Sequence, residues 1–409
     1  MIPILQESFY VQASTTGASN APFVFPVEWL NSNESLRSAC QRWQQCEALA
    51  LDTEFERVRT FWPILALIQI CDGEKVYLID PLKIDDWSPF AAVLANTSVV
   101  KVMHAAGEDL EAFAHTCGAD ITPLFDTQMA LAYAGLGASL GLAAVVRERY
   151  QVELSKETAR TDWLVRPLTQ AQVDYAVTDV IYLLDLYADL KAHLHDLEKL
   201  DWFWQDGEQA MAKVHHQEPD ALLYRRVKQV NLLRGQELAI AQGLASWREQ
   251  EAKATDTSRN HLIRDEGIIT LAQKTPKNWN DFTALNVLHP KVSRLHGKTL
   301  LNLIEKARAL PSGQWPLPVS RLLDIKGGRG LLDQMASEVR SFAEAHQLPA
   351  ELVYSKRALE SIIIAAVDRL PQAPFVWRGW RQQAFLNPFT HLLTNAGIAL
   401  PGWWQEQSS

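Results

Sequence analysis

One stretch decides the fold: LALDTEFERVRTFWPILALIQICDG, from Leu49 to Gly73. The apolar run Ala48–Leu51 predicts a buried strand that ends at DTEF. Because alternate residues of an extended chain share one face, Asp52 and Glu54 are expected to point the same way. The stretch therefore predicts a strand that presents two carboxylates together.

Such a pair is costly to hold, because neighbouring carboxylates raise one another's pKa unless a cation neutralises them. A divalent metal ion is the simplest reason to build the pair. An Asp-x-Glu sequence is also common at solvated strand ends, so the two residues alone indicate a metal site only weakly. Further ligands must come from the rest of the chain.

The residues around this stretch predict a mixed sheet. Two further strands follow after short linkers, which favour antiparallel neighbours. The pattern then changes to an alternation of helix and strand, which is typical of an α/β sheet with helices on its faces. The predicted elements are a helix at 33–45, strands at 61–71 and 75–80, a helix at 86–95, a strand at 99–104 and a helix that begins near Gly107.

Asp109 lies in the first turn of this last helix, directly after the strand VVKVMH. Ligands of open α/β sheets gather where strands end and helices begin, so Asp109 is a candidate third carboxylate. The alternative is that the helix dipole alone favours an acidic residue there. Asp126 is predicted to cap a helix, and His104 to be packed or hydrogen-bonded rather than to bind a metal.

A fourth carboxylate comes from a long amphipathic helix that is predicted to begin at Thr169 and to continue past Leu184. Tyr175 and Asp179 are four residues apart on it, so they lie on one face. Asp174 and Asp185 fall away from this alignment and are predicted to be solvated.

Four carboxylates without a cluster of cysteine or histidine suit hard cations, and the predicted cofactor is a pair of Mg²⁺ or Mn²⁺ ions. Two such ions ~3.5–4 Å apart stabilise the attacking and departing oxygens of an in-line phosphoryl displacement. A phenol near the ions can orient or help to deprotonate a water molecule. The pattern therefore predicts hydrolysis of a phosphodiester, with these candidate site residues: Asp52, Glu54, Asp109, Tyr175 and Asp179.

Three ordered motifs, DTEF at 52–55, HAAGEDLE at 104–111 and YAVTD at 175–179, resemble those of the DEDD exonucleases. The tyrosine four residues before the last aspartate is similar to the DEDDy branch, and RTDWLVRPLTQAQ at 160–172 resembles the ribonuclease D family. The resemblance implies a ribonuclease H-like fold and 3′→5′ hydrolysis of RNA to nucleoside 5′-monophosphates, with tRNA precursors as substrates. It also implies that Asp52, Glu54, Asp109 and Asp179 bind the metals and that Tyr175 positions the water.

The charge of the chain is segregated. The whole chain has a net charge of -9, whereas residues 225–308 contain 15 basic and 8 acidic residues, a net charge of +7. A basic module beside an acidic centre suits a phosphate backbone, although solvated helix faces would give the same pattern. The sequences at 247–272 and 289–307 resemble an HRDC domain, and those at 348–366 and 376–385 a more divergent second one. HGKT, at 296–299, lacks the earlier glycine of a phosphate-binding loop, because Val292 stands in its place.

These observations predict six segments. They are a flexible extension at 1–25, an exonuclease domain at 26–200, a linker at 201–224, an HRDC domain at 225–310, a linker at 311–318 and an HRDC-like domain at 319–409. Trp377 and Trp380 of the last segment are predicted to pack in its interior, with base stacking as the alternative.

Composition favours a cytoplasmic protein. No apolar run reaches the ~18 residues of a membrane span, no secretory signal is recognisable, and the four cysteines form no CxxC pair. RNA is the expected partner, and a monomer is the default. Two alternatives stay open: a DNA 3′→5′ exonuclease of the proofreading type, which uses the same carboxylates, and a non-catalytic RNA-binding scaffold.

Overall fold

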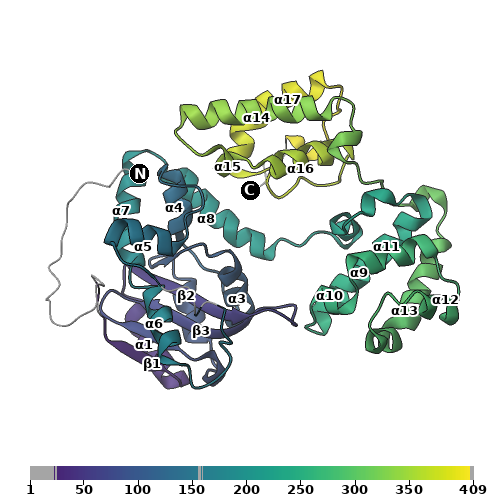
Figure 1. The fold of residues 1–409 in the computed structure, drawn as a ribbon. Helices are drawn as coiled ribbons and strands as arrows, with labels where there is room; N and C mark the ends of the chain where they lie inside the picture. Colours follow the sequence, from purple (N-terminus) through teal and green to yellow (C-terminus); the bar gives the residue numbers. More distant parts are fainter. Residues whose placement is uncertain (1–22, 24, 155–157, 159, 406–409) are drawn as a thin grey trace. The chain divides into compact units, whose positions relative to one another are not determined.

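The computed structural model describes residues 23, 25–154, 158 and 160–405. The predicted N-terminal extension lies almost entirely outside these residues, and the predicted domain boundaries stay predictions. The described chain divides into two compact units, whose elements are labelled in Figure 1. The first unit takes in the described parts of Met1–Glu56, Pro63–His215 and Val339–Ser355, and the second those of Arg57–Trp62, His216–Glu338 and Lys356–Ser409.

The first unit contains a six-stranded mixed sheet in the order β1-β4-β3-β2-β5-β6. The pairs β2–β3 and β3–β4 are antiparallel, whereas β1–β4, β2–β5 and β5–β6 are parallel. The predicted mixed α/β sheet is therefore confirmed. The strands are β1 (Val27–Leu30), β2 (Ala48–Glu56), β3 (Ile64–Cys71), β4 (Val76–Ile79), β5 (Val100–Met103) and β6 (Leu124–Asp126).

Strand β2 is longer than the sequence predicted. The apolar run was expected to end before Asp52, but pairing with β3 continues to Glu56, with a register shift between Glu54 and Phe55. The extra residues find hydrogen-bond partners along β3, which is apolar and almost wholly buried. Asp52 and Glu54 therefore lie within a central strand rather than at its end.

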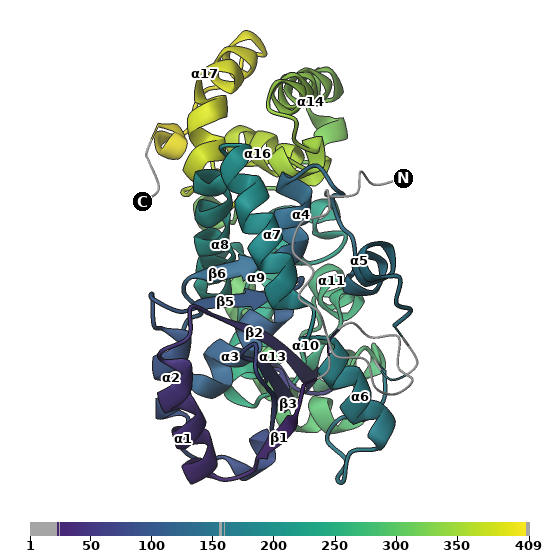
Figure 2. The same cartoon turned by 90° about the vertical axis from the view of Figure 1, so that its left-hand side faces the viewer.

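Helices cover both faces of the sheet. Leu49 and Leu51 share one apolar cluster with residues of α1 (Asn33–Trp43), α2 (Ser88–Leu94) and α3 (Gly107–Cys117). Figure 2 shows α1 and α2 beside each other along this side of the strands. On the other face Phe125 of β6 packs on aromatic residues of α7 (Leu183–Asp196) and α8 (Leu200–His215). The shorter helices of this unit include α4 (Thr127–Tyr133) and α5 (Leu142–Tyr150).

The long helix predicted from Thr169 is wrong, because the chain forms two helices, α6 (Gln170–Thr178) and α7. The four successive residues 180–183 are all buried. The side chains of four consecutive residues point around all sides of a helix, so a turn between α6 and α7 brings them to the interior while Asp179 stays beside β2. Asp185 stays partly solvated, with 37% of its side chain exposed, but its carboxylate also accepts hydrogen bonds from Arg149 and Tyr150, which the sequence did not predict.

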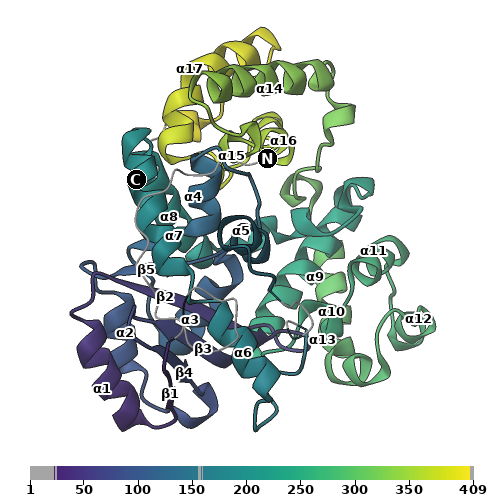
Figure 3. The ribbon, with the colours of Figure 1, turned by 60° about the vertical axis from the view of Figure 1, so that its left-hand side comes forward.

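The second unit is helical. Helix α13 packs along α9, and both contribute to one apolar core (Figure 3). Trp377 and Trp380 are buried, as predicted, which excludes them as exposed stacking platforms. The helices with residues in this unit are α9 (Gly235–Ala254), α10 (Arg259–Leu262), α11 (Asp265–Lys274), α12 (Trp279–Ala284), α13 (Pro290–Arg308), α14 (Gly328–Ala345), α16 (Lys356–Val367) and α17 (Gly379–Asn395). Helix α14 crosses into the first unit, which also holds α15 (Ala350–Val353).

Among the helices that the structure describes, none combines the length and the apolar character that a membrane crossing needs. All four cysteines are free thiols. Burial raises the pKa of the Cys40 and Cys71 thiols, so these side chains act as small apolar residues of the core.

Candidate metal centre

Strand β2 supplies the first two carboxylates of the site. Asp52 and Glu54 alternate with Thr53, so they share the face of the sheet opposite to Leu51. Their neighbours in the antiparallel pair are Gln69 and Leu67 of β3. Pairing on both sides of β2 fixes the backbone from which the two carboxylates extend.

Asp179 completes a group of three. Carboxylate oxygens of Asp52, Glu54 and Asp179 all lie within 4.8 Å of one another. Asp179 is the C-cap residue of α6, and its backbone N–H still bonds to the carbonyl of Tyr175, so the four-residue spacing survives although the predicted long helix does not. The end of α6 thus brings a carboxylate from far along the sequence to the face of β2.

Asp109 approaches from α3. It is buried in the first turn of the helix, as predicted, and its carboxylate accepts a hydrogen bond from the Thr53 hydroxyl. Asp109 is not a member of the three-residue group, but its charge helps to raise the pKa of Asp52, Glu54 and Asp179. Asp109 therefore lies close enough to the other three carboxylates to interact with them electrostatically.

The turn that delivers Asp109 is anchored by Asp126. The Asp126 carboxylate accepts hydrogen bonds from the backbone N–H groups of Ala105 and Ala106, both at 3.0 Å. It also caps α4 by accepting from Gln128 and Met129, which confirms the predicted N-cap. One side chain thus fixes the starts of two helices, and Ala105 takes a left-handed conformation, φ 59°, to make the turn.

Tyr175 lies one helical turn before Asp179, and its phenol, next to that carboxylate, partly offsets the effect of burial on the pKa of Asp179. Its ring packs on Trp163, with the ring centroids 6.0 Å apart. Burial, followed by the charges of the neighbouring carboxylates, raises the pKa of Tyr175 above its usual value. The phenol is therefore protonated at neutral pH and acts through hydrogen bonds.

The electrostatics of the group favour a bound cation. Burial, and then the other carboxylates, raise the pKa of Asp52 and bring that of Glu54 to about 9. Burial raises the pKa of Asp109 to about 6 and that of Asp179 to about 7. A divalent ion would supply the missing positive charge to this set of hard oxygen donors.

Gln69 is a residue that the sequence analysis missed. Its side chain is fully buried opposite Asp52, and both amide atoms lack a hydrogen-bond partner within the described protein. A buried amide without partners is expensive, so a group that is bound in the site would satisfy it. The signal was present in the sequence, since Gln69 is the single polar residue of the strand ILALIQIC. The carboxylate oxygens fit divalent ions, and the amide oxygen of Gln69 offers a further hard donor.

His104 stays outside the cluster, as predicted. Its Nδ1 lies 2.8 Å from the Thr127 hydroxyl and its Nε2 lies 3.0 Å from the carbonyl of Leu140. Both ring nitrogens therefore have structural partners. The sequence analysis also missed that Thr53 is the partner of Asp109. Alternation in DTEF places Thr53 on the same face as Leu51, which is the face that α3 covers.

The basic residues of the second unit differ in whether they are paired with a carboxylate. Arg225, Arg226, Arg248, Lys253 and Arg259 are ion-paired with carboxylates of the same unit. Among the residues that the structure describes, the lysines and arginines of α11–α13 and of the turns between them form no ion pair, whereas His296 of α13 lies 4.0 Å from Glu251. Part of the basic excess is therefore structural, and the remainder is available to an anion.

Comparison with known proteins extends these observations to both units. The chain matches the family models of a 3′-5′ exonuclease over residues 27–195 and of an HRDC domain over residues 237–304. It is 38% identical to ribonuclease D of Pseudomonas paraeruginosa over 366 residues, which cover 88% of this chain and 97% of the relative. It is 37% identical to ribonuclease D of Escherichia coli strain K12 over 371 residues, or 90% of this chain and 98% of the relative. The crystal structure of Escherichia coli RNase D, an exoribonuclease involved in structured RNA processing, superposes with a TM-score of 0.84 and 35% identity and covers 91% of this chain and 99% of that one.

Proposed function

The chain belongs to the ribonuclease D family of 3′→5′ exoribonucleases, and we propose that it shortens RNA by hydrolysis from the 3′ end, releasing nucleoside 5′-monophosphates. The observation that carries the proposal is the cluster of Asp52, Glu54 and Asp179, with Asp109 and Tyr175 beside it. Precursors of tRNA are the proposed substrates, in keeping with the structured RNA on which the Escherichia coli relative acts.

Asp52, Glu54, Asp109 and Asp179 are the proposed ligands of two divalent ions, Mg²⁺ or Mn²⁺. Bound ions would stabilise the attacking and departing oxygens of the phosphodiester. The chain's own contribution is to hold four carboxylates in place before substrate arrives. β2 fixes two of them, the α3 turn and Thr53 fix the third, and the end of α6 fixes the fourth.

Tyr175 is proposed to position the attacking water molecule. Its phenol lies beside the carboxylates of Asp52, Glu54 and Asp179, and a protonated phenol can both donate a hydrogen bond to and accept one from water. Its ring packs on that of Trp163, which supports its position beside the carboxylates. Because the phenol is protonated, it orients the water instead of removing its proton as a phenolate would.

RNA is proposed to reach the second unit through the cations of α11–α13. These side chains have no carboxylate partner within the described chain, so a phosphate backbone can take that place. We further propose that the protein works as a monomer in the cytoplasm. Light scattering at several concentrations measures the first point, and cell fractionation measures the second.

One experiment tests the activity. Purified protein is incubated with 5′-labelled single-stranded RNA or DNA of equal sequence, in Mg²⁺, Mn²⁺ or EDTA, beside the variant Asp52→Asn. We expect a ladder that shortens from the 3′ end on RNA and disappears with EDTA and with the substitution. Asp185→Asn is the matched control, since this aspartate pairs with Arg149 and Tyr150 away from the cluster.

The same assay separates the alternatives. A ladder on DNA of equal rate would favour a DNA exonuclease, and binding of RNA without any shortening would favour a scaffold. Internal cuts, or activity that survives Asp52→Asn, would contradict the proposed mechanism.

A further inference from the structure

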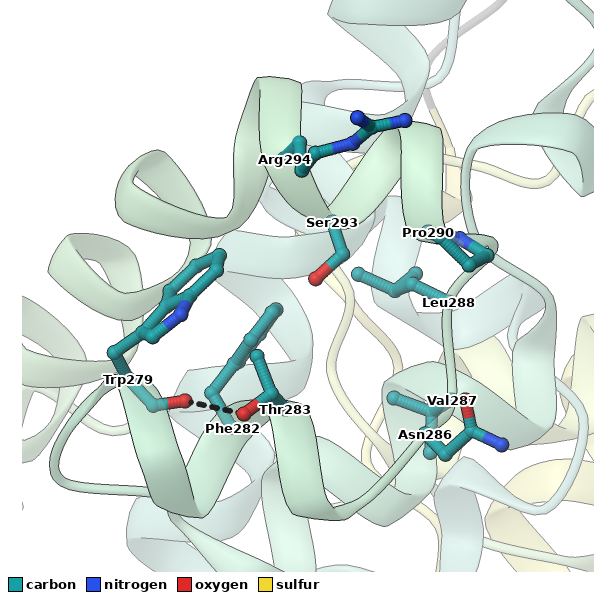
Figure 4. Close-up of a pocket in the computed structure, with 9 residues that line it drawn as sticks. All are labelled: Trp279, Phe282, Thr283, Asn286, Val287, Leu288, Pro290, Ser293 and Arg294. Atoms are coloured by element: carbon teal, nitrogen blue, oxygen red, sulfur yellow. Dashed lines mark hydrogen bonds between the residues drawn. The ribbon is translucent and has the colours of Figure 1, made fainter.

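A small hollow lies in the second unit, where the loop after α12 leads into α13. It has a volume of about 240 Å³. Figure 4 shows the side chains that surround it, with Trp279 and Phe282 on one side and Leu288 and Pro290 on the other. The nine lining residues are Trp279, Phe282, Thr283, Asn286, Val287, Leu288, Pro290, Ser293 and Arg294.

The aromatic wall of the hollow is held in place although it is exposed. Trp279 is 41% exposed, which is unusual for the largest apolar side chain. Its ring stacks on Phe282 at 5.8 Å with an interplanar angle of 22°. It also covers Gly297 of α13 so closely that a Cβ atom there would come within 2.5 Å of the ring. The absence of a side chain at Gly297 thus lets the indole pack against α13. The indole is held against Phe282 and remains partly exposed to solvent.

The rest of the lining pairs an apolar floor with a polar rim. Phe282 and Leu288 are buried, whereas the hydroxyl of Ser293 points into the hollow in Figure 4. Asn286, which also lines the hollow, has a left-handed backbone, φ 48°. Arg294 forms no ion pair with another residue of the described chain, and no carboxylate lines the hollow.

These features select one kind of occupant. Pockets for drug-sized ligands measure roughly 300–1,000 Å³, so this one suits a single ring system. An exposed indole offers a stacking surface, and an amide can both donate to and accept from the edge of a base. Arg294, with Lys291 and Lys298 on the same helix, supplies positive charge for the attached phosphates. Aromatic walls also serve peptide grooves, so it is the positive charge around the hollow that favours a base attached to phosphates.

We propose that this hollow binds one unstacked nucleobase of a single-stranded RNA, which stacks on Trp279 while Arg294 faces the adjoining phosphate. The proposal takes its ligand from the proposed function. The charge pattern alone would predict that this part of the second unit contacts only the phosphate backbone of RNA. The hollow adds a contact that depends on the presence of a base.

An abasic scan tests the proposal. Full-length protein carrying Asp52→Asn, which prevents degradation, is titrated with a labelled 12-nucleotide RNA and with versions that lack the base at one position each. We expect removal of one base to weaken binding about tenfold, because stacking on an aromatic side chain contributes that much. In the additional variant Trp279→Ala, the intact RNA should bind as weakly as that abasic RNA, and the position should no longer matter.

Three further variants control the test. Asn286→Gly removes the amide but keeps the left-handed backbone, and should weaken binding severalfold at the same position. Arg294→Ala should reduce the salt dependence of binding without changing the response to the abasic site. Leu295→Ala alters a side chain on the same helix that is 65% exposed and does not line the hollow, so binding should stay the same. Thermal unfolding of each variant checks the fold.

The outcomes separate this site from the proposed function. In one outcome, the wild-type protein shortens RNA while the loss of affinity at every abasic position is the same with and without Trp279 or Asn286. That result would contradict the proposed base pocket and leave the proposed exoribonuclease activity intact. If wild-type protein does not shorten RNA, the proposed function fails first. A change of oligomeric state in Trp279→Ala, measured by light scattering, would show that the hollow seats a second copy and would also overturn the proposal.

Discussion

Tyr175 and Tyr150 each lie beside aspartates, but only Tyr175 lies in the carboxylate cluster. The phenol of Tyr175 is close to the carboxylates of Asp179 and Glu54, whereas Tyr150 donates a hydrogen bond to Asp185 at 2.5 Å. The two tyrosines therefore offer a direct comparison between a phenol in the site and a phenol that serves the fold.

Tyr175→Phe is expected to lower kcat by about 10²-fold while the dissociation constant for RNA changes by no more than about twofold. The substitution keeps the ring that packs on Trp163 and removes only the group that would orient water. Single-turnover kinetics and binding to the metal-free protein measure the two quantities. Tyr150→Phe should leave turnover unchanged. Equal turnover in both variants would remove Tyr175 from the mechanism.

The carboxylate cluster also predicts how stability depends on pH without metal. Folding raises the pKa of Glu54 to about 9 and that of Asp179 to about 7, from about 4 in an unfolded chain. Between these values the folded state binds more protons than the unfolded state, so stability is greatest at low pH and is lost as the pH rises. In EDTA we expect the Tm to fall by several degrees between pH 5.5 and pH 8.5.

Two comparisons isolate the origin of that fall. Mg²⁺ or Mn²⁺ should remove most of it, because a cation compensates the charges that folding brings together. Glu54→Gln should raise the Tm in EDTA at pH 8.5 and flatten the pH profile. An identical profile for this variant and the wild type would contradict the proposed charge repulsion.

At the scale of elements, the segment before α6 determines where Tyr175 and Asp179 lie. Thr169 and Gln172 form a capping box, in which each side chain accepts a hydrogen bond from the other's backbone N–H. The amide of Gln172 also donates to the Thr161 hydroxyl and to the carbonyl of Asp162, at 3.1 and 3.2 Å. The start of the helix and the preceding loop are thereby fixed to each other.

Gln172→Ala should therefore loosen α6 at its start, with a loss of stability of about 1–2 kcal/mol and a larger effect on kcat than on RNA binding. Hydrogen exchange of residues 160–178 and steady-state kinetics measure both effects. Gln170→Ala is the matched control, because within the described part of the chain the side chain of that exposed glutamine bonds to Asp174 of the same helix alone. Faster exchange without any change in turnover would show that α6 does not position the site.

Over the whole molecule, acidic and basic charges serve different units. The chain carries -9 overall, the first unit concentrates carboxylates at β2, and the second holds cations on α11–α13 that have no acidic partner among the described residues. The average charge hides this division. This separation of charge would attract divalent ions to the first unit and the phosphate backbone of RNA to the second.

The division predicts which cations control the salt dependence of RNA binding. Lys291→Ala and Lys298→Ala should each reduce the slope of log K against log salt by about 0.7, the contribution of one phosphate contact on a single strand. Lys253→Ala should change it little, because Lys253 already pairs with Glu249 at 3.7 Å. A slope that is flat in the wild type would eliminate the basic track altogether.

The sequence by itself determined the elements that depend on local patterns. Apolar runs and turn residues predicted the mixed sheet, the start of α3 at Gly107 and the cap at Asp126, because these follow from hydrogen bonding and side-chain periodicity within a few residues. The five candidate site residues were also chosen from the sequence, and their assignment as ligands and water-positioning group awaits the experiments above.

Tertiary structure decided what depends on distant partners. β2 extends to Glu56 because β3 supplies its hydrogen bonds, and the predicted long helix breaks after Asp179 because residues 180–183 must all be buried. The buried amide of Gln69 and the bond from Thr53 to Asp109 arise only when separate strands and helices meet. DTEF thus specified two carboxylates on one face, whereas packing decided that Asp179 would lie within 4.8 Å of them.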